Sequence, residues 1–523
     1  MKKPANRLDE RILLCFLVMF GLCLAFYFTF RYGGTWIEND SAVLTGYITA
    51  MQREGDLTPD GATYQHGFLF QALSVLISDL SGITISSLQR LIFPFLSITI
   101  LVISAWYFFN QATNDTRQTA LAVLLLCLQG DVLFVIFRGS HEKLDWPLIM
   151  LSLGLLFNSY KQGGKKLIVC IALFYLLAFA QVSVNIFFAT TFLTAILLSM
   201  VTGRLIQFIK SRRSVFSGAE AERLLYITLS VSIIAFLFIS YIYPPALNNL
   251  HTMENIFQKL VSLLVNPALA TRPYDYISIG WINNETYLSL STFTWLLIFG
   301  SMGFWIKRGW RLINGQEPFR LKNQLDWLLY TGFAFQVGAS MVIDLSGALG
   351  KNLQLRVFPG FTVVAVLILS KGLLGLLPII KLIPVTRKAL SLVMVFFVAW
   401  LPVAAVLKAS NEPILSNQWM IYSESEVEAV DWAIEHLEQA QIWTGIDNRI
   451  MHAFNIERGT SHDKILVAFS NFENIRHVVL SQKEVLRATR IGFSLPPTFG
   501  WMTLYDNGEV QVFKKPPVTP FQK

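Results

Sequence analysis

Charged residues are scarce in this sequence. They make up 15% of its 523 residues, against 54% hydrophobic residues and a mean hydropathy of +0.51. Soluble domains carry about 25% charged residues, so this composition predicts an integral membrane protein. The net charge of +8 does not indicate nucleic acid as a partner, because the Lys and Arg residues lie in short segments between apolar runs.

Cysteine is rarer still. The four cysteines, Cys15, Cys23, Cys127 and Cys170, all lie inside apolar runs, which excludes a disulfide framework, a Cys/His zinc site and a thiol nucleophile. A glycine-rich nucleotide-binding motif and an obvious internal repeat are also missing. The apolar runs are continuous rather than alternating, so we expect membrane-spanning helices.

Apolar runs long enough to cross a bilayer number eleven. They are residues 12–30, 88–109, 117–137, 146–160, 167–181, 184–203, 224–243, 287–306, 325–343, 354–378 and 389–408. Basic loops favour the cytoplasm, which places the N-terminus inside and the segment after 408 outside. A further apolar run, 66–80, would break this alternation as a span, so we expect it to lie at the outer interface.

The predicted fold class is a polytopic α-helical membrane protein with about 11 spans, N-in and C-out. Its membrane module covers residues 1–408, and its first outer loop, 31–87, contains interfacial helices. A small extracytoplasmic α/β domain covers 409–523, with a predicted helix at 424–439 and strands at 441–446, 464–469 and 476–480. Alternating residues around Asn507-Gly508 predict a closing hairpin over 503–513 with a tight primed turn.

The first outer loop carries acidic residues just beyond the first span. Glu38 and Asp40 precede an amphipathic stretch from Ser41 to Arg53, and Tyr64 and His66 follow it. Asp40 is a candidate catalytic group, but Asn39 or Asp40 capping the helix that begins at Ser41 is an equal alternative, since Asp and Asn are favoured caps.

The second outer loop is polar for a turn between two spans. It contains Arg138, His141, Glu142 and Lys143, with Asp145 beside Trp146. Cationic side chains can extend to the headgroups without a function, and Glu142 can pair with them. Ionisable residues so close to hydrocarbon nevertheless favour a functional site.

Basic residues in two further outer segments break the positive-inside pattern. Arg356 begins a span from the outer side, with Lys351 and Asp344 shortly before it. The planar fork of Arg and the point charge of Lys both suit phosphate oxygens, although a simple headgroup contact is the alternative. Arg272 in the third outer loop is a weaker candidate, as is His66.

Together these residues suit group transfer from a lipid phosphate. We assign catalytic roles to Asp40, Glu38, Glu142 and His141, and binding of a donor phosphate to Arg356, Lys351, Lys143 and Arg138. A carboxylate can take the proton of an attacking hydroxyl while cations stabilise the departing phosphate. The residues establish no cofactor, and Mg²⁺ or Mn²⁺ on Asp40, Glu142 and His141 stays open.

The arrangement resembles the GT-C superfamily of membrane glycosyltransferases, which includes oligosaccharyltransferases, protein O-mannosyltransferases and aminoarabinose transferases. The resemblance lies in a first span followed by a long outer loop with an acid, Asp40, interfacial helices, a polar second loop and an outer terminal domain. It implies a polyprenyl-phosphate donor, Asp40 as the essential acid, His141-Glu142-Lys143 as the second-loop site and Arg356 on the donor phosphate. The second loop lacks a paired-acid Asp-x-Asp motif and the tail lacks a Trp-Trp-Asp motif, so neither metal dependence nor protein N-glycosylation follows.

The resulting hypothesis is a glycosyltransferase that moves a sugar from a polyprenyl-phosphate donor to a glycan, lipid or protein acceptor. The expected location is a prokaryotic plasma (inner) membrane, with the active site on the extracytoplasmic face. Two alternatives stay open. One is a transporter or assembly scaffold for lipids or polysaccharides, and the other is a glycan polymerase or ligase.

Overall fold

The computed structural model describes most of the membrane module and part of the terminal domain. The described residues are 7–31, 39–60, 63–211, 230–270, 284–317, 321–347, 353–380, 396, 399–410, 422–437, 442–443, 475–491 and 494–516. Within them, seven helices are long and apolar enough to cross a membrane, or eight if one bent pair is a single span. The chain is therefore an integral membrane protein.

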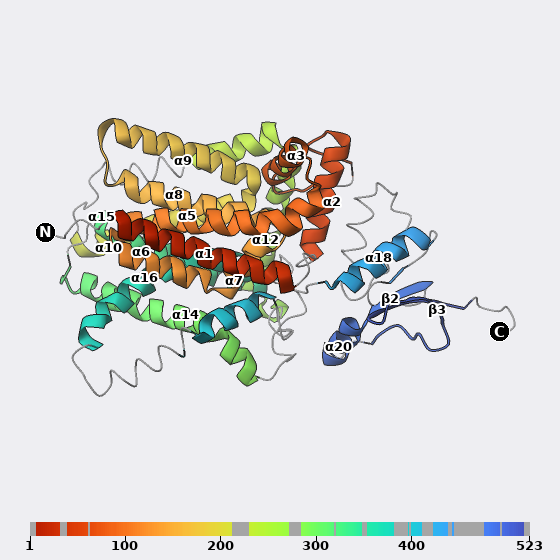
Figure 1. The fold of residues 1–523 in the computed structure, drawn as a ribbon. Helices are drawn as coiled ribbons and strands as arrows, with labels where there is room; N and C mark the ends of the chain where they lie inside the picture. Colours follow the sequence, from red (N-terminus) through yellow and green to blue (C-terminus); the bar gives the residue numbers. More distant parts are fainter. Residues whose placement is uncertain are drawn as a thin grey trace.

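The helices form one bundle, with the N-terminus near one end and the strands of the terminal domain beyond the other (Figure 1). Neighbouring pairs include α1 with α5, α5 with α8, α8 with α9, and α15 with both α10 and α16. The helices are α1 (Arg7–Arg31), α2 (Asn39–Glu54), α3 (Leu69–Ser81), α4 (Ile85–Ser87), α5 (Phe93–Thr113), α6 (Thr116–Cys127), α7 (Gly130–Phe137), α8 (Glu142–Ser159), α9 (Gly164–Val184), α10 (Ile186–Ser211), α12 (Asn248–Val265), α14 (Asn284–Ile313), α15 (Leu321–Leu345) and α16 (Leu353–Ile380). Short helical turns occur at Leu88–Ile92, Phe238–Ile242, Pro244–Leu247 and Pro267–Leu269.

Each of the eleven apolar runs falls on helical structure where it is described. Seven coincide with the long apolar helices, and the run 117–137 is the bent pair α6 and α7. The run 146–160 lies on α8, whose first turn carries Glu142, Lys143 and Asp145. The runs 224–243 and 389–408 are described in part, as the shorter helices Ser230–Ile242 and Ala399–Ser410.

α7 is bent by 71° from α6, and an ion pair joins it to the helix Ala399–Ser410. Lys408 Nζ lies 3.3 Å from Asp131 Oδ2 in the first turn of α7 and 2.9 Å from Thr294 Oγ1. A Cβ on Gly130 would lie 2.9 Å from Lys408 Cβ, so only glycine allows this approach. The bend directs α7 toward the second polar loop.

The helix α3 has the length expected of an interfacial segment. Its 13 residues span about 20 Å, less than the roughly 30 Å hydrocarbon core. It ends at Gly82, whose φ of 69° closes the helix in the left-handed region. Gln52 of α2 donates to Asp79 Oδ1 at 2.6 Å, which joins α2 and α3 into one platform.

The terminal domain contains a four-stranded sheet in the order β1-β2-β4-β3. Its elements are α18 (Glu424–His436), β1 (Ile442–Trp443), β2 (His477–Ser481), α20 (Gln482–Ile491), β3 (Met502–Asp506) and β4 (Val510–Lys514). β1 pairs parallel with β2, and the other pairs are antiparallel. The predicted strand 464–469 lies outside the described residues, and α20 was not predicted.

The predicted hairpin is present, but Asn507-Gly508 is not a two-residue connection between its strands. Asp506 pairs with Gln511, and residues 507–509 lie between β3 and β4. A type I′ turn needs positive φ at both central residues, whereas Gly508 has φ +86° and Asn507 does not have a positive φ. Asn507 instead accepts the Val510 N–H through its side chain at 2.9 Å.

The terminal domain shares a small core with the first loop of the membrane module. Ala42 of α2 belongs to the same buried apolar cluster as Tyr422, Ala429 and Val512. α18 begins with a capping box between Ser423 and Glu426, which fixes the start of the helix that contributes to this cluster. The domain therefore packs beside the first turn of α2.

Candidate functional site

The first turn of α2 meets the second polar loop. The structure begins this helix at Asn39, which places Asp40 inside the first turn rather than before it. The next residue, Ser41, accepts the Gly139 backbone N–H through Oγ at 2.7 Å. A Cβ on Gly139 would lie 3.0 Å from Ser41 Cβ, so glycine permits this contact. Asp40 and the loop after α7 are thus neighbours, although 98 positions separate Ser41 and Gly139 in the chain.

An ion pair organises the second loop. Arg138 Nη2 lies 2.8 Å from Glu142 Oε2, and the two side chains are only 12% and 8% exposed. Arg138 Nε donates to Ser140 Oγ at 2.9 Å, and its guanidinium stands over the Phe134 ring. Charge-assisted hydrogen bonds of this kind are stronger than neutral ones, and they hold the Arg138 guanidinium in place. Glu142 is therefore committed to a partner inside the loop.

His141 lies in a hydrogen-bonded group contributed by three segments. Asn185, between α9 and α10, places Nδ2 2.5 Å from His141 Nε2. Asn185 Oδ1 accepts the N–H groups of Phe187 and Phe188, which caps α10 and fixes the orientation of the amide. Its Nδ2 must then donate, so Nε2 accepts and the imidazole is neutral. Tyr64 completes the group, with its hydroxyl 3.3 Å from the same nitrogen.

The electrostatics agree with a neutral His141. Burial lowers the pKa of His141 well below its usual value, and the charges of Arg138, His66 and Arg356 lower it further. Burial raises the pKa of Tyr64 well above 10, so its hydroxyl keeps its proton. Arg356, exposed in the first turn of α16, also lowers the pKa of His66, after the larger effect of burial. The positive charge of Arg356 therefore acts on the residues around the second loop.

His66 ties the first loop to two distant segments. Its Nδ1 lies 2.6 Å from Asn249 Oδ1 at the start of α12. Its carbonyl accepts the Ile186 N–H at 2.8 Å, and the Phe68 N–H donates to Ser183 O at 2.9 Å. These bonds explain how Tyr64 comes to face His141.

Lys143 and Asp145 are buried beside this group. Lys143 is 1% exposed, and its ammonium stands 5.6 Å from the Phe93 ring centroid, so it is not open to a lipid phosphate in this structure. Asp145 is fully buried, with Oδ2 4.0 Å from His141 Nε2. Neither the Lys143 ammonium nor the Asp145 carboxylate has a hydrogen-bond partner among the described residues.

The Asp344 side chain binds backbone N–H groups. Its carboxylate accepts the Leu353 and Gln354 N–H groups at 2.8 and 2.9 Å, which caps α16 from the end of α15. This cap positions Arg356 one turn later. Asp344 therefore has a structural role at the start of α16.

The structure does not assemble the proposed metal ligands. Among the described residues, no three acidic, histidine or cysteine side chains lie close enough together to hold a metal ion. Asp40 and His141 lie on different segments, and Glu142 pairs with Arg138. These residues do not fit Mg²⁺ or Mn²⁺, and we derive no step through a metal.

Three predicted site residues, Glu38, Arg272 and Lys351, lie outside the described residues. Sequence reasoning missed Asn185 and named Asp145 in the second loop without giving it a role. Asn185 is a strongly polar residue at the junction of two apolar runs, and that position was a usable signal. Nothing in the sequence pattern predicted that the Asp145 side chain would be buried.

No protein-family model and no curated protein sequence matches the chain. Solved structures do. The oligosaccharyltransferase of Archaeoglobus fulgidus in its apo form aligns with a TM-score of 0.57 at 11% identity, covering 90% of this chain and 69% of that one. The same enzyme, AglB, in complex with an inhibitory peptide and a dolichol-phosphate aligns with a TM-score of 0.54 at 11% identity, covering 98% and 75%. The chain has the GT-C fold.

A second GT-C glycosyltransferase is also similar. ArnT from Cupriavidus metallidurans in its apo state aligns with a TM-score of 0.42 at 11% identity, covering 97% of this chain and 98% of that one. The GT-C likeness expected from the sequence is confirmed at the level of fold by the alignments with the oligosaccharyltransferase.

Proposed function

We propose that this chain is a GT-C glycosyltransferase that transfers a sugar from a polyprenyl-phosphate donor to a hydroxyl- or amide-bearing acceptor. The observation that supports this proposal is the contact of Ser41 with Gly139, which joins the first turn of α2, where Asp40 lies, to the second loop, which carries the Arg138–Glu142 pair. This contact supports a site in which an acid, Asp40, and a cation for the phosphate, Arg138, come from two segments that are distant in the chain. The acceptor is a glycan, a lipid or a protein.

In the proposed reaction, the acceptor nucleophile attacks the anomeric carbon of the sugar. The bond between that carbon and the phosphate oxygen breaks, and the electron pair leaves with the polyprenyl phosphate. Asp40 takes the proton of the acceptor group. Arg138, with Arg356 nearby, stabilises the charge that develops on the phosphate, because a guanidinium matches phosphate oxygens with two parallel bonds.

The neutral group around His141 has a positioning role in this proposal. Because Nε2 accepts from Asn185, His141 cannot also serve as an acid at that nitrogen. Because it lies next to Glu142, His141 instead helps to fix the backbone of the loop that carries Arg138. Glu142 orients the Arg138 fork rather than acting as a base.

We further propose eleven spans, with the N-terminus inside and the terminal domain outside, in a prokaryotic plasma membrane. The distribution of basic loops supports this orientation. The length of α3 supports its exclusion from the spans, because a twelfth span would reverse the later loops. The site then faces the extracytoplasmic side.

The test is a transfer assay on the purified full chain in nanodiscs, supplied with a panel of polyprenyl-phosphate sugars, in which released polyprenyl phosphate is measured by mass spectrometry. Asp40→Asn should lower the rate by about 10²–10⁴-fold, the usual contribution of a general base. Asp60→Asn, in an exposed position of the same loop, is the matched control and should keep the wild-type rate. An Asp40→Asn variant as fast as the wild type would exclude the catalytic assignment.

A further inference from the structure

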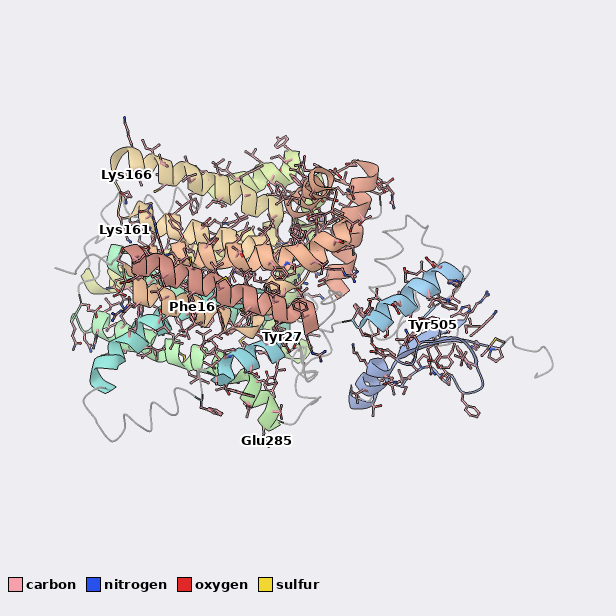
Figure 2. The ribbon with its side chains drawn as sticks, viewed as in Figure 1. Phe16, Tyr27, Lys161, Lys166, Glu285 and Tyr505 are labelled. Atoms are coloured by element: carbon pink, nitrogen blue, oxygen red, sulfur yellow. The ribbon has the colours of Figure 1, made fainter. Side chains whose placement is uncertain are left out.

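A basic cavity lies at the opposite end of the bundle from His141. α8 begins beside His141 and runs for 18 residues, about 27 Å, before Lys161. Figure 2 shows Lys161 at the end of the bundle that holds the N-terminus, with Tyr505 of the terminal domain at the far side. The cavity has a volume of about 300 Å³, at the lower limit of small-molecule sites.

Lysines from two helices or their ends line this cavity, and an arginine of a third helix contacts its carboxylate. Lys161 follows α8, and its Nζ donates to Asn114 Oδ1 at 2.6 Å and to the Gln111 carbonyl. Lys371 of α16 donates to Asp326 Oδ2 at 2.7 Å and to the Ala112 carbonyl at 3.1 Å. Arg308 of α14 reaches the same carboxylate oxygen of Asp326 at 2.8 Å.

These contacts leave an excess of positive charge. Two lysines, Lys161 and Lys371, and one carboxylate, Asp326, line the cavity, while Arg308 lies between Asp326 and Glu317, whose Oε2 is 3.9 Å from its Nε. The partial negative charge at the C-terminal end of α5 accounts for only one lysine at this position. Two lysines from separate elements border the cavity here, and the Lys371 ammonium has three protons for its two acceptors.

The other walls of the cavity are apolar or aromatic. Phe157 and Tyr160 of the α8 end also line it. A cavity lined by both ammonium groups and rings suits a phosphate that carries an organic substituent. Basic pockets between membrane helices on the cytoplasmic side bind anionic headgroups.

We propose that this cavity binds a phosphate-bearing anion through Lys161 and Lys371, presented by an anionic phospholipid of the leaflet at this end of the bundle. The site is separate from the one assigned to glycosyl transfer and does not depend on that function. Its ligand chemistry is a phosphate ester next to a glycerol-sized apolar group.

The test uses the full chain in phosphatidylcholine nanodiscs that contain a minor fraction of phosphatidylglycerol, with co-purifying lipid measured by native mass spectrometry. The wild type should retain phosphatidylglycerol selectively. Lys161→Gln with Lys371→Gln should lower that retention by about tenfold or more, since it removes both ammonium groups that would donate charge-assisted hydrogen bonds to the phosphate. The control Lys165→Gln with Lys166→Gln removes the same charge at exposed positions of the same end and should retain the lipid.

A second arm separates the two sources of phosphate. Inorganic phosphate, added to delipidated protein in detergent, should raise the melting temperature of the wild type less than phosphatidylglycerol does. If inorganic phosphate is equally effective, the site holds, but its ligand is a soluble phosphate ester. If the wild type prefers neither phosphatidylglycerol nor phosphate, the proposal is overturned, whether or not the glutamine variants fold. Lys161→Arg with Lys371→Arg should restore binding.

Discussion

Asn185 shows how one side chain can connect a helix end to a site. Its oxygen caps α10 and its nitrogen donates to His141, so the cap decides which way the amide faces. An amide is suited to both tasks, because it carries an acceptor and a donor on one planar group. The neutral state of His141 is thus a consequence of how α10 begins.

Asn185→Asp should separate these two tasks. The carboxylate still caps α10, but it replaces a donor with a negative charge beside His141 Nε2, which raises the pKa of His141. We expect the melting temperature to stay near that of the wild type, and the transfer rate to gain a new inflection in its pH profile below neutrality. Asn185→Ala, which also removes the cap, should cost about 1 kcal/mol of stability. An unchanged pH profile in Asn185→Asp would contradict the assignment of the amide.

Stability should depend on pH through His141. Its folded pKa is lowered from about 6.5, so the unfolded state binds the proton first as pH falls. The stabilisation is therefore fully present above pH of about 6.5 and is lost as pH falls toward the folded value. His141→Gln should show a smaller loss of melting temperature between pH 7 and pH 5 than the wild type, measured in the same detergent. Equal losses would show that His141 is not held neutral.

At the scale of elements, the site depends on a short backbone pairing. The segment of His66 and Phe68 bonds to Ser183 and Ile186 at the junction of α9 and α10. Gly67 lies in this pairing, where a Cβ would come within 2.4 Å of two carbonyl oxygens. Backbone atoms cannot move aside as a flexible side chain can.

Gly67→Ala should therefore destabilise the protein by at least about 1–3 kcal/mol, the usual cost of overpacking. Because the pairing also places Tyr64, the transfer rate should fall in whatever fraction stays folded. Gly303→Ala in α14 is the control, since a Cβ there meets nothing within 4 Å and alanine favours a helix. Thermal melting of both variants gives the comparison. A Gly67→Ala variant as stable as Gly303→Ala would contradict the pairing.

The elements also show what the sequence could predict. Apolar length predicted the spanning helices, and the amphipathic stretch after Asp40 predicted α2, because both depend on local pattern. The pattern could not predict that Asp344 caps α16, since the bonds cross from the end of one helix to the start of another. Nor could it predict the partners of His141 and Asn185, whose contact spans 44 positions. The turn at Asn507 was mistaken because its side chain, rather than positive φ, closes it.

At the scale of the whole molecule, polar groups gather at both ends of the bundle. One end carries the Asp40 and Arg138 region with the terminal domain against α2. The other carries the cavity around Lys161 and Lys371. The proposed orientation assigns the first end to the extracytoplasmic face and the second to the cytoplasm.

Single-cysteine labelling tests this orientation in a variant without the four native cysteines. Ser81→Cys, at the exposed end of α3, should react with an impermeant maleimide added outside intact cells. Lys166→Cys, exposed at the other end, should react only after the membrane is opened. Labelling of Ser81→Cys from the cytoplasmic side alone would make α3 a span and reverse the proposed topology.

The most direct test of the central claim is a cryo-electron microscopy map of the full chain with bound polyprenyl phosphate. The account predicts density for the phosphate within reach of the Arg138 and Arg356 guanidinium groups, on the side of the second loop where Asp40 lies. The prenyl chain should run from there into the membrane. A phosphate bound away from both arginines, with the Arg138–Glu142 region empty, would contradict the assignment of this site to glycosyl transfer.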